Sequence, residues 1–155
     1  MDAGSKPQFG GAAAAKDDFA IGSAVVTAPA GWSDAKKEKD RVVLRSPDGR
    51  QQATISILRF DAGASFDDFK RLCALRIEAE KGALADGFVQ PGAPFEDVGT
   101  FGMFFSGGEK RAARIFSGYL TRKQRELITV YVEGIGVAPK DHLASFEALA
   151  SGLRR

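Results

Sequence analysis

Residues 99–136 restrict the fold more than any other part of the chain, because they form three consecutive β-type runs separated by short turns. The stretch is GTFGMFFSGGEKRAARIFSGYLTRKQRELITVYVEGIG. Its β-branched and aromatic residues predict strands at about 99–106, 111–120 and 125–134. Gly107-Gly108 supplies the first turn and Thr121 to Gln124 the second. Strands joined by such short connections pair in antiparallel fashion, so the sequence predicts an antiparallel sheet.

Further strands are expected before this region. Arg41 to Ser46 and Ala53 to Phe60 flank the turn Pro47-Asp48-Gly49, in which proline fixes φ and glycine accepts a positive φ. One strand is expected over Phe19 to Thr27, ended by Pro29. The mixed charges of Lys36 to Arg41 predict a solvated loop, and Pro91-Gly92-Ala93-Pro94 predicts another loop.

Two helices complete the pattern. The first is predicted from Ser65 to about Leu84, because Ser65 and Asp68 have capping-box spacing and Phe66, Phe69, Cys73 and Ile77 share one stripe. The second begins at Pro139, with Leu143, Phe146, Leu149 and Leu153 on its apolar side. The order of strands, helix, strands and helix predicts an α+β fold, in which a mostly antiparallel sheet packs with helices in an α/β/α sandwich.

Length and charge limit the classes of function. The chain has 155 residues, and we expect an Ala/Gly-rich arm over residues 1–18 and one domain over residues 19–155. Its 22 basic and 20 acidic residues argue against a dedicated nucleic-acid binder. No apolar run approaches the roughly 20 residues that span a bilayer, so no membrane span is expected.

The compartment stays open between two alternatives. The N-terminal stretch MDAGSKPQFGGAAAAKDDFAIG lacks the charged start and apolar centre of a signal peptide, and a single cysteine suits a reducing compartment. The chain as it stands is therefore expected in the cytoplasm. The alternative is a periplasmic protein whose export signal has been removed. Asp17-Asp18 is expected to be part of the solvated arm.

The residues that could carry chemistry do not form a recognisable catalytic or metal-binding set. His142 is the only histidine and Cys73 the only cysteine, whereas zinc needs about four ligands. We interpret both as structural residues and expect no cofactor and no metal. Gly134-Ile135-Gly136 lacks the third glycine of a dinucleotide fingerprint, and Gly102 and Gly107 are followed by Gly108 where a phosphate loop needs lysine.

Two groups of residues are candidates for binding a partner. Basic residues gather near the turns of the predicted sheet and could attract an acidic partner: Lys110, Arg111, Arg114, Arg122 and Lys123. The alternative is that they protect turns and strand edges from aggregation. Phe104 and Phe105 must face opposite sides of one strand. We expect helices to cover both sides, and the alternative is one exposed ring that binds something.

The sequence resembles the PsbP-like superfamily. The resemblance rests on VVTAPAGW, VVLRSPDGRQQATISILRF, SFDDFKRLCALRIEA, RAARIFSGYLTRKQRELITVYV and FEALASGL, which cover nearly the whole predicted domain. In that family the Pro-x-Gly-Trp element ends the first strand and its aromatic residue packs under the sheet. The resemblance therefore implies that Trp32 is a core residue. Apart from it, the helix stripes predict that Phe69, Cys73, Ile77 and Phe146 are core residues.

The resemblance also implies a class of function. Proteins of this superfamily generally act as binding or assembly proteins, and bacterial relatives in type VI secretion serve as effector chaperones or immunity proteins. We therefore expect a non-enzymatic protein-binding domain whose partner is an effector or toxin. The alternatives are an envelope domain for assembly or small-ligand binding and, last, an enzyme with an atypical site at His142 or Cys73.

Overall fold

The structure is a computed structural model, and it describes residues 18–155. Two helices and a series of strands follow one another along these residues. The elements are β1 (Asp18–Ile21), β2 (Ala24–Thr27), β3 (Ser33–Glu38), β4 (Arg41–Arg45), β5 (Gln51–Arg59), α2 (Phe66–Gly82), β6 (Gly87–Pro91), β7 (Phe95–Asp97), β8 (Thr100–Glu109), β9 (Arg114–Lys123), β10 (Glu126–Ile135), α3 (Pro139–Ser151) and β11 (Leu153–Arg154). The expected arm lies almost entirely outside the described residues, and its last residue, Asp18, begins β1.

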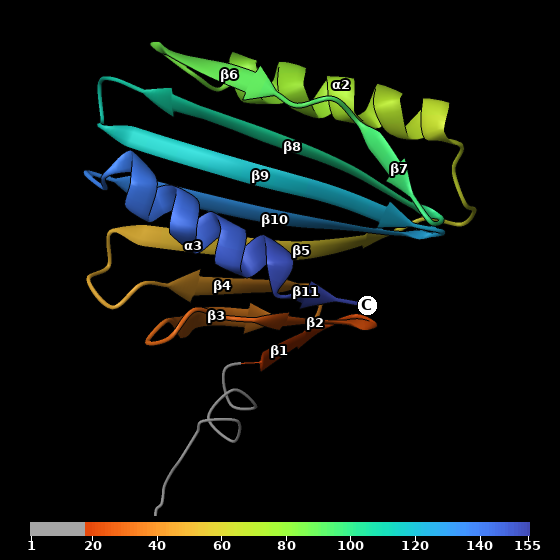
Figure 1. The fold of residues 1–155 in the computed structure, drawn as a ribbon, viewed down its shortest axis with the longest axis horizontal. Coiled ribbons are helices and arrows are strands. Elements are labelled where there is room, and N and C mark those ends of the chain that lie inside the picture. The colour runs from red at the N-terminus through yellow and green to blue at the C-terminus, as the bar shows by residue number, and fades with distance from the viewer. Residues whose placement is uncertain (1–17) are drawn as a thin grey trace, which may run out of the picture.

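The strands form two antiparallel sheets (Figure 1). The large sheet has the order β3-β4-β5-β10-β9-β8-β6, and β7 pairs with β8 next to β6. The small sheet has the order β1-β2-β11 and therefore joins the two ends of the described chain. Every strand pair is antiparallel, and the predicted α+β fold with a mostly antiparallel sheet is confirmed.

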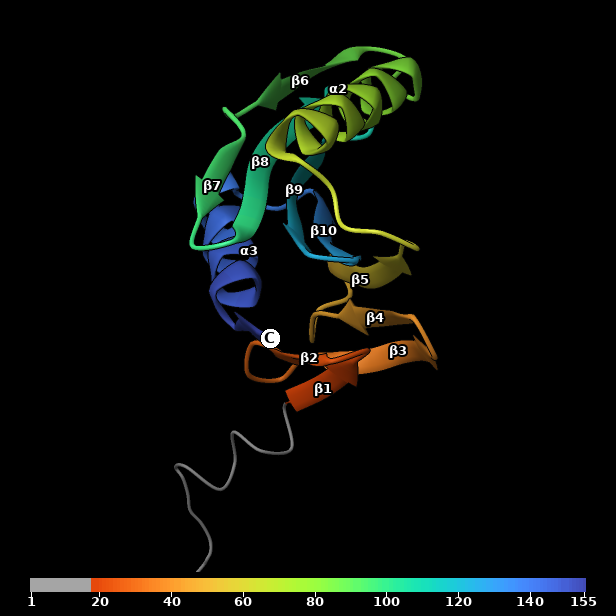
Figure 2. The same ribbon diagram turned by 90° about the vertical axis from the view of Figure 1, so that its right-hand side faces the viewer.

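The two helices cover opposite faces of the large sheet (Figure 2). Helix α2 packs against β6 and β8, whereas α3 packs against β9 and β10. We call these faces the α2 face and the α3 face. Side chains along β10 alternate between these two faces. Leu127 and Tyr131 belong to the cluster under α2, whereas Ile128 and Val130 belong to the cluster under α3 and the small sheet. This period of two is why each strand can bury apolar residues on both sides.

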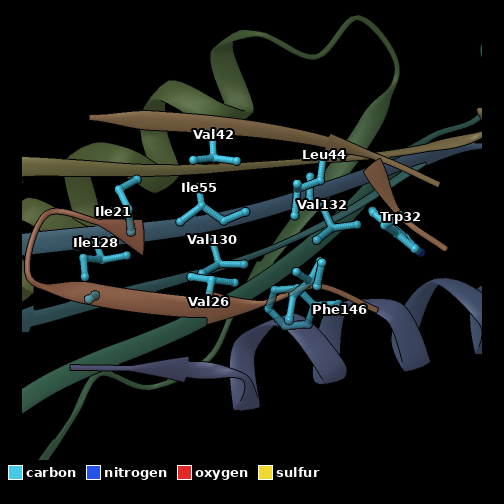
Figure 3. Packing of buried hydrophobic residues seen from close by; sticks show 14 of the residues in the cluster. Ile21, Val26, Trp32, Val42, Leu44, Ile55, Ile128, Val130, Val132 and Phe146 are labelled. Atoms are coloured by element: carbon cyan, nitrogen blue, oxygen red, sulfur yellow. The ribbon is translucent and has the colours of Figure 1, made fainter. Parts of the chain in front are cut away.

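Trp32 occupies the core on the α3 face. Figure 3 shows its ring beside Leu44, Val132 and Phe146, and the residue is 9% exposed. The backbone turns sharply just before it: Gly31 has a φ of 84°, and the Trp32 amide donates to the Pro29 carbonyl at 3.2 Å. The turn at the Pro-x-Gly sequence thus places the indole in the core on this face of the sheet. The other expected core residues, Phe69, Cys73, Ile77 and Phe146, are also buried.

Three phenylalanine rings lie opposite glycines that have no room for a side chain. The pairs are Phe105 with Gly118, Phe116 with Gly107, and Phe95 with Gly102. A Cβ added to any of these glycines would come within 2.2–2.4 Å of the opposite ring or of a backbone atom. Each ring therefore occupies the space that a side chain at its partner glycine would need. The spacing of Gly102 and Gly107 resembles that of a phosphate loop, but in the structure these glycines make room for the Phe95 and Phe116 rings.

The helix start and the first hairpin agree with the sequence. Ser65 Oγ accepts from the Asp68 amide at 3.1 Å, and the Asp68 carboxylate accepts from the Ser65 amide, which completes the capping box. The turn at Pro47 to Gly49 joins β4 and β5, with Gly49 at a φ of 74°.

Several predicted elements were wrong in detail. Phe19 to Thr27 is two strands, because Gly22 adopts a φ of 58° and reverses the chain into a hairpin. The charged run from Lys36 is largely strand β3, whose side chains are all exposed and which forms a sheet edge. Gly107-Gly108 lies inside β8, and the turn follows at residues 110–113.

The C-terminal part of the chain also differs from its prediction. Leu153 pairs with Val26 in β11 and is not part of α3, which ends at Ser151. Strands β6 and β7 on either side of the Gly92-Ala93-Pro94 link were not predicted. Both are short, and their glycine and proline residues mask the strand pattern.

Candidate binding trough

Part of the large sheet is left open on the α3 face. Because α3 packs over β9 and β10, neither of the two described helices lies above the same face of β8 and β6. A cavity of about 760 Å³ opens there between α3 and β6. Its floor comes from β8 and β9, one wall from α3 and the other from the end of β6. The residues that matter most are Gln90, Phe104, Ser117, Tyr119, Leu143 and Glu147.

Three stacked aromatic rings form a row that runs from the floor of this cavity to β7. Phe104 on β8 stacks on Tyr119 of β9, with ring centroids 4.4 Å apart and planes 10° apart. On its other side Phe104 stacks at 6.0 Å on Phe95 of β7. Phe146 of α3 meets the Phe104 ring edge-on at 6.2 Å. The three stacked rings thus belong to three paired strands, and the helix borders the row from one side.

A second cavity of about 520 Å³ continues along the same strands. Gln90 and Ser106 line the first cavity, and Phe88 and Gly108, two residues away along β6 and β8, line the second. Ile115 and Pro139 close it on the α3 side. We refer to the two cavities together as the trough. Around it lie four large exposed hydrophobic residues, 37–61% exposed: Phe88, Phe95, Phe104 and Leu143.

Charged residues line both cavities of the trough. In the second cavity the acidic Asp86 and Glu109 balance the basic Lys110 and Arg114. In the first cavity the charged residue is Glu147 of α3. A bound molecule would therefore meet an acidic position near the C-terminal end of α3.

The structure separates the two predicted phenylalanines. Phe105 is 3% exposed and packs on the α2 face, whereas Phe104 is 41% exposed in the trough. They face opposite sides of β8, as expected for neighbours in a strand. The expectation that helices cover both was wrong, because α3 lies too far along the sheet to cover β8.

Two of the predicted basic residues are committed to contacts within the protein. The Arg114 guanidinium donates to Glu133 at 2.8 Å and to Glu109 at 3.0 Å, and it also contacts the Tyr131 hydroxyl. Arg122 is 5% exposed. It lies 4.0 Å above the Phe60 ring centroid and donates to the Gln124 and Ala62 carbonyls. Arg122 is thus held inside the protein, whereas Arg114 also lines the second cavity of the trough.

The remaining basic candidates do not form one patch. Lys110 and Arg111 are exposed in the β8–β9 turn, whereas Lys123 is exposed where β9 ends. The ten residues of β9 separate these turns by about 30 Å at roughly 3.3 Å per residue. Of the basic residues expected to bind a partner and free of such contacts, Lys110 is the one that lines the trough.

Most residues in and around the trough were not predicted as binding residues. Tyr119 could have been found from the hairpin register, because it lies directly opposite Phe104. Phe95 and Gln90 depend on β7 and β6, whose short runs gave no strand signal. Leu143 was assigned to the apolar stripe of α3, but it is 50% exposed and borders the open side.

His142 is a buried member of α3 that anchors the helix on the sheet. It is 1% exposed, and its Nε2 lies 2.9 Å from Ser117 Oγ on β9. Its Nδ1 is buried without a hydrogen-bond partner among the described residues. Burial lowers the pKa of the imidazole, since the charged form would lose its hydration. The contact therefore involves a neutral imidazole and contributes to packing.

The stability of the protein is expected to fall in mild acid because of this histidine. The unfolded chain takes up a proton near pH 6.5, and the folded imidazole resists protonation, so stability is full above that pH and declines below it. The loss is at most about 1.4 kcal/mol per pH unit. Urea unfolding at pH 7.5, 6.0 and 5.0 should show a steeper decline for the native protein than for His142→Gln.

The comparison with His142→Gln isolates the imidazole. Three carboxyl groups have lowered pKa values because they accept hydrogen bonds in the folded state, namely Asp18, Asp48 and Asp68. Their protonation in acid destabilises both proteins equally. Equal slopes for the two proteins would show that His142 titrates normally in the folded state.

Cys73 is a core residue of α2. The thiol is 1% exposed, and burial raises its pKa to about 11. A thiol that is neither ionised nor accessible is a poor nucleophile. We therefore expect the native protein to react with a disulfide reagent at pH 8 about 100-fold more slowly than the urea-unfolded chain. Labelling of the folded protein at the unfolded rate would contradict this placement.

The described part of the chain offers neither a metal-binding cluster nor a helix for crossing a membrane. Across residues 18–155, no group of three or more His, Cys, Asp or Glu side chains is arranged to hold a metal ion. Within the same residues, neither α2 nor α3 is long and apolar enough to cross a membrane.

Comparisons with known proteins identify the fold. No protein-family profile matches the chain. No curated protein matches it either. Among solved structures, the chain is similar to cyanobacterial PsbP (CyanoP) from Synechocystis sp. PCC 6803, with a TM-score of 0.55 and 16% identity over 84% of this chain and 85% of that one.

A second similarity is to a protein from Bacteroides thetaiotaomicron VPI-5482, with a TM-score of 0.44 and 14% identity. It covers 84% of this chain and 44% of that one. The likeness to CyanoP extends over most of both chains and concerns the arrangement of sheet and helices. The chain therefore has a PsbP-like fold.

Proposed function

We propose that this chain is a non-enzymatic protein-binding domain that holds an amphipathic helix of a partner protein in the trough. The observation that carries the proposal is the aromatic floor left open beside α3, with Phe104 at 41% exposure. Large exposed apolar surfaces in hollows are typical of binding sites. The proposal agrees with the effector chaperone or immunity protein that the sequence resemblance implies, with an effector or toxin as the partner.

The spacing of the sheet favours a helix as the bound element. Helix α3 lies over β9 and β10, and the centre of the uncovered pair β8 and β6 lies two strand spacings from the centre of β9 and β10. Two strand spacings amount to about 9.6 Å. Packed helices are separated by about 8–10 Å. A helix placed over β8 and β6 would therefore touch both the aromatic floor and α3, and it would complete the layer on this face.

The carboxylate of Glu147 favours one orientation of that helix. The N-terminal end of a helix carries partial positive charge and therefore suits this carboxylate, which lines the first cavity. Because Glu147 lies in the C-terminal half of α3, the bound helix would run antiparallel to α3.

The inaccessibility of the reactive side chains supports a role without catalysis. His142 and Cys73 are each 1% exposed, and the polar partner of His142 is Ser117. A general base must reach the proton that it removes, either directly or through one water molecule. Neither side chain lines the trough.

A small apolar ligand is the second candidate for the trough. The first cavity, at about 760 Å³, falls within the range of about 300–1,000 Å³ that is typical of small-molecule sites. Such a ligand would stack on Phe104 and Tyr119 and reach Gln90 or Ser106. This function corresponds to the envelope ligand-binding domain considered from the sequence.

A designed peptide tests the proposal. The probe is a helix of about five turns with an apolar stripe, and the control has the same composition in shuffled order. In an NMR titration, we expect shifts at Phe104, Tyr119 and Leu143 with the helical probe only. Equal binding of both peptides, or shifts elsewhere, would contradict the proposal. Binding of a small apolar dye in place of the helical probe would favour the second candidate.

A further inference from the structure

Strand β6 forms one edge of the large sheet, and no strand within residues 18–155 pairs with its outer side. The opposite edge, β3, has the sequence SDAKKE and carries charged side chains along its length. The short strands β1, β7 and β11 also contain charged residues. By contrast, β6 is GFVQP, without a charged side chain. Charge on edge strands prevents unwanted pairing, so the uncharged edge is the one able to accept another strand.

The backbone of β6 presents a definite set of free groups. Gly92 N–H donates to the Phe104 carbonyl at 2.7 Å, and Lys110 N–H donates to the Asp86 carbonyl at 3.3 Å. Since bonding alternates along an antiparallel pair, the even-numbered residues of β6 bond to β8. Gly87, Val89 and Pro91 therefore turn their backbone groups outward. Pro91, which has no N–H, stands at a position where β8 requires none.

We propose that β6 pairs with β6 of a second copy of this chain, antiparallel and centred on Val89. In this register the two Val89 residues exchange their N–H and C=O groups. Gly87 of each copy donates to Pro91 of the other, which needs only to accept. The result is about four backbone hydrogen bonds and no outward N–H of β6 left unpaired. This match between the segment and itself is the reason for choosing a second copy over an unrelated strand.

Side chains on the α3 face agree with this register. Phe88 is 61% exposed and packs over Gly108. In the paired strands it stands opposite Gln90 of the second copy, and the two Phe88 rings are diagonal neighbours within reach of each other. Both troughs then open on the same side of one continuous sheet. The inference does not depend on what the trough binds.

Sedimentation of the full chain at increasing concentration tests the proposal. A single short strand gives a small interface, so we expect half-dimerisation between about 10 and 500 µM. Phe88→Glu, which places two carboxylates near each other, should weaken association about tenfold or more. Leu58→Glu is the matched control, because Leu58 is 55% exposed on β5, away from this edge. It should leave association unchanged.

Amide hydrogen exchange tests the proposed register between the two β6 strands. At high concentration the amides of Gly87 and Val89 should become protected, whereas those of Phe88 and Gln90 should be equally protected at every concentration. A protein that stays monomeric up to about 500 µM would overturn the proposal. So would a dimer in which the Gly87 and Val89 amides exchange as fast as in the monomer, because the copies would then meet elsewhere.

Discussion

Replacing Gly118 by valine is expected to destabilise the protein by about 3 kcal/mol or more, because the position has no room for a side chain. Gly118 is buried at the middle of β9, directly opposite Phe105. A Cβ there would lie 2.2 Å from the Phe105 ring. That ring is 3% exposed and packs against Phe116 and Tyr131, with centroids 6.4 and 6.3 Å away, so it has no free space to enter. Thermal unfolding should show a melting temperature lower by about 10 °C or more.

Gly82→Ala is the control for Gly118→Val. Gly82 is the last residue of α2, and a Cβ there meets nothing within 4 Å. Alanine is also the better helix former, so this variant should be as stable as the native protein or slightly more stable. A second variant, Gly118→Val with Phe105→Ala, should recover part of the stability that Gly118→Val loses. A Gly118→Val protein with native stability would mean that the ring does not lie over the glycine.

Phe104→Asp is expected to weaken binding of the helical peptide probe about 30-fold or more, which corresponds to about 2 kcal/mol. Phe104 is central in the aromatic row, between Phe95 and Tyr119. A carboxylate at this position would have to lose its hydration when a helix covers the floor. Isothermal titration calorimetry with the native protein and the variant gives the ratio of the dissociation constants.

The matched control for Phe104→Asp is Leu58→Asp. It introduces the same charge at an exposed apolar residue, but on β5 and outside both cavities. The native protein and Leu58→Asp should bind the probe equally. Urea unfolding of both variants establishes that each is folded. If Phe104→Asp binds as the native protein does, the trough is not the site of the helix.

The fold could be predicted from the sequence where the signal is local. The Ser65 and Asp68 capping box, the Pro47 to Gly49 turn and the alternation in β5 and β10 each depend on residues close together in the chain. Trp32 was anticipated from the resemblance, and its place in the core depends on the turn at Gly31.

The trough could not be predicted, because it depends on where separate elements stop. Its existence follows from the position of α3 over β9 and β10, which no single segment encodes. The contacts of Arg114 and Arg122 within the protein could not be predicted for a related reason. Their carboxylate, carbonyl and aromatic partners come from distant parts of the sequence, such as Glu133 and Phe60. Because both arginines lie near turns in the sequence, their positions gave no sign of these contacts within the protein.

Site-specific photo-crosslinking tests the central claim most directly. A photoreactive phenylalanine analogue is placed at position 104 in one protein and at position 58 in another, and both are expressed in the cells that make the protein naturally. We predict one discrete adduct from position 104, joined to an amphipathic helical segment of another protein, and none from position 58. Equal adducts from both positions, or none from position 104, would contradict the claim that the trough holds a partner helix.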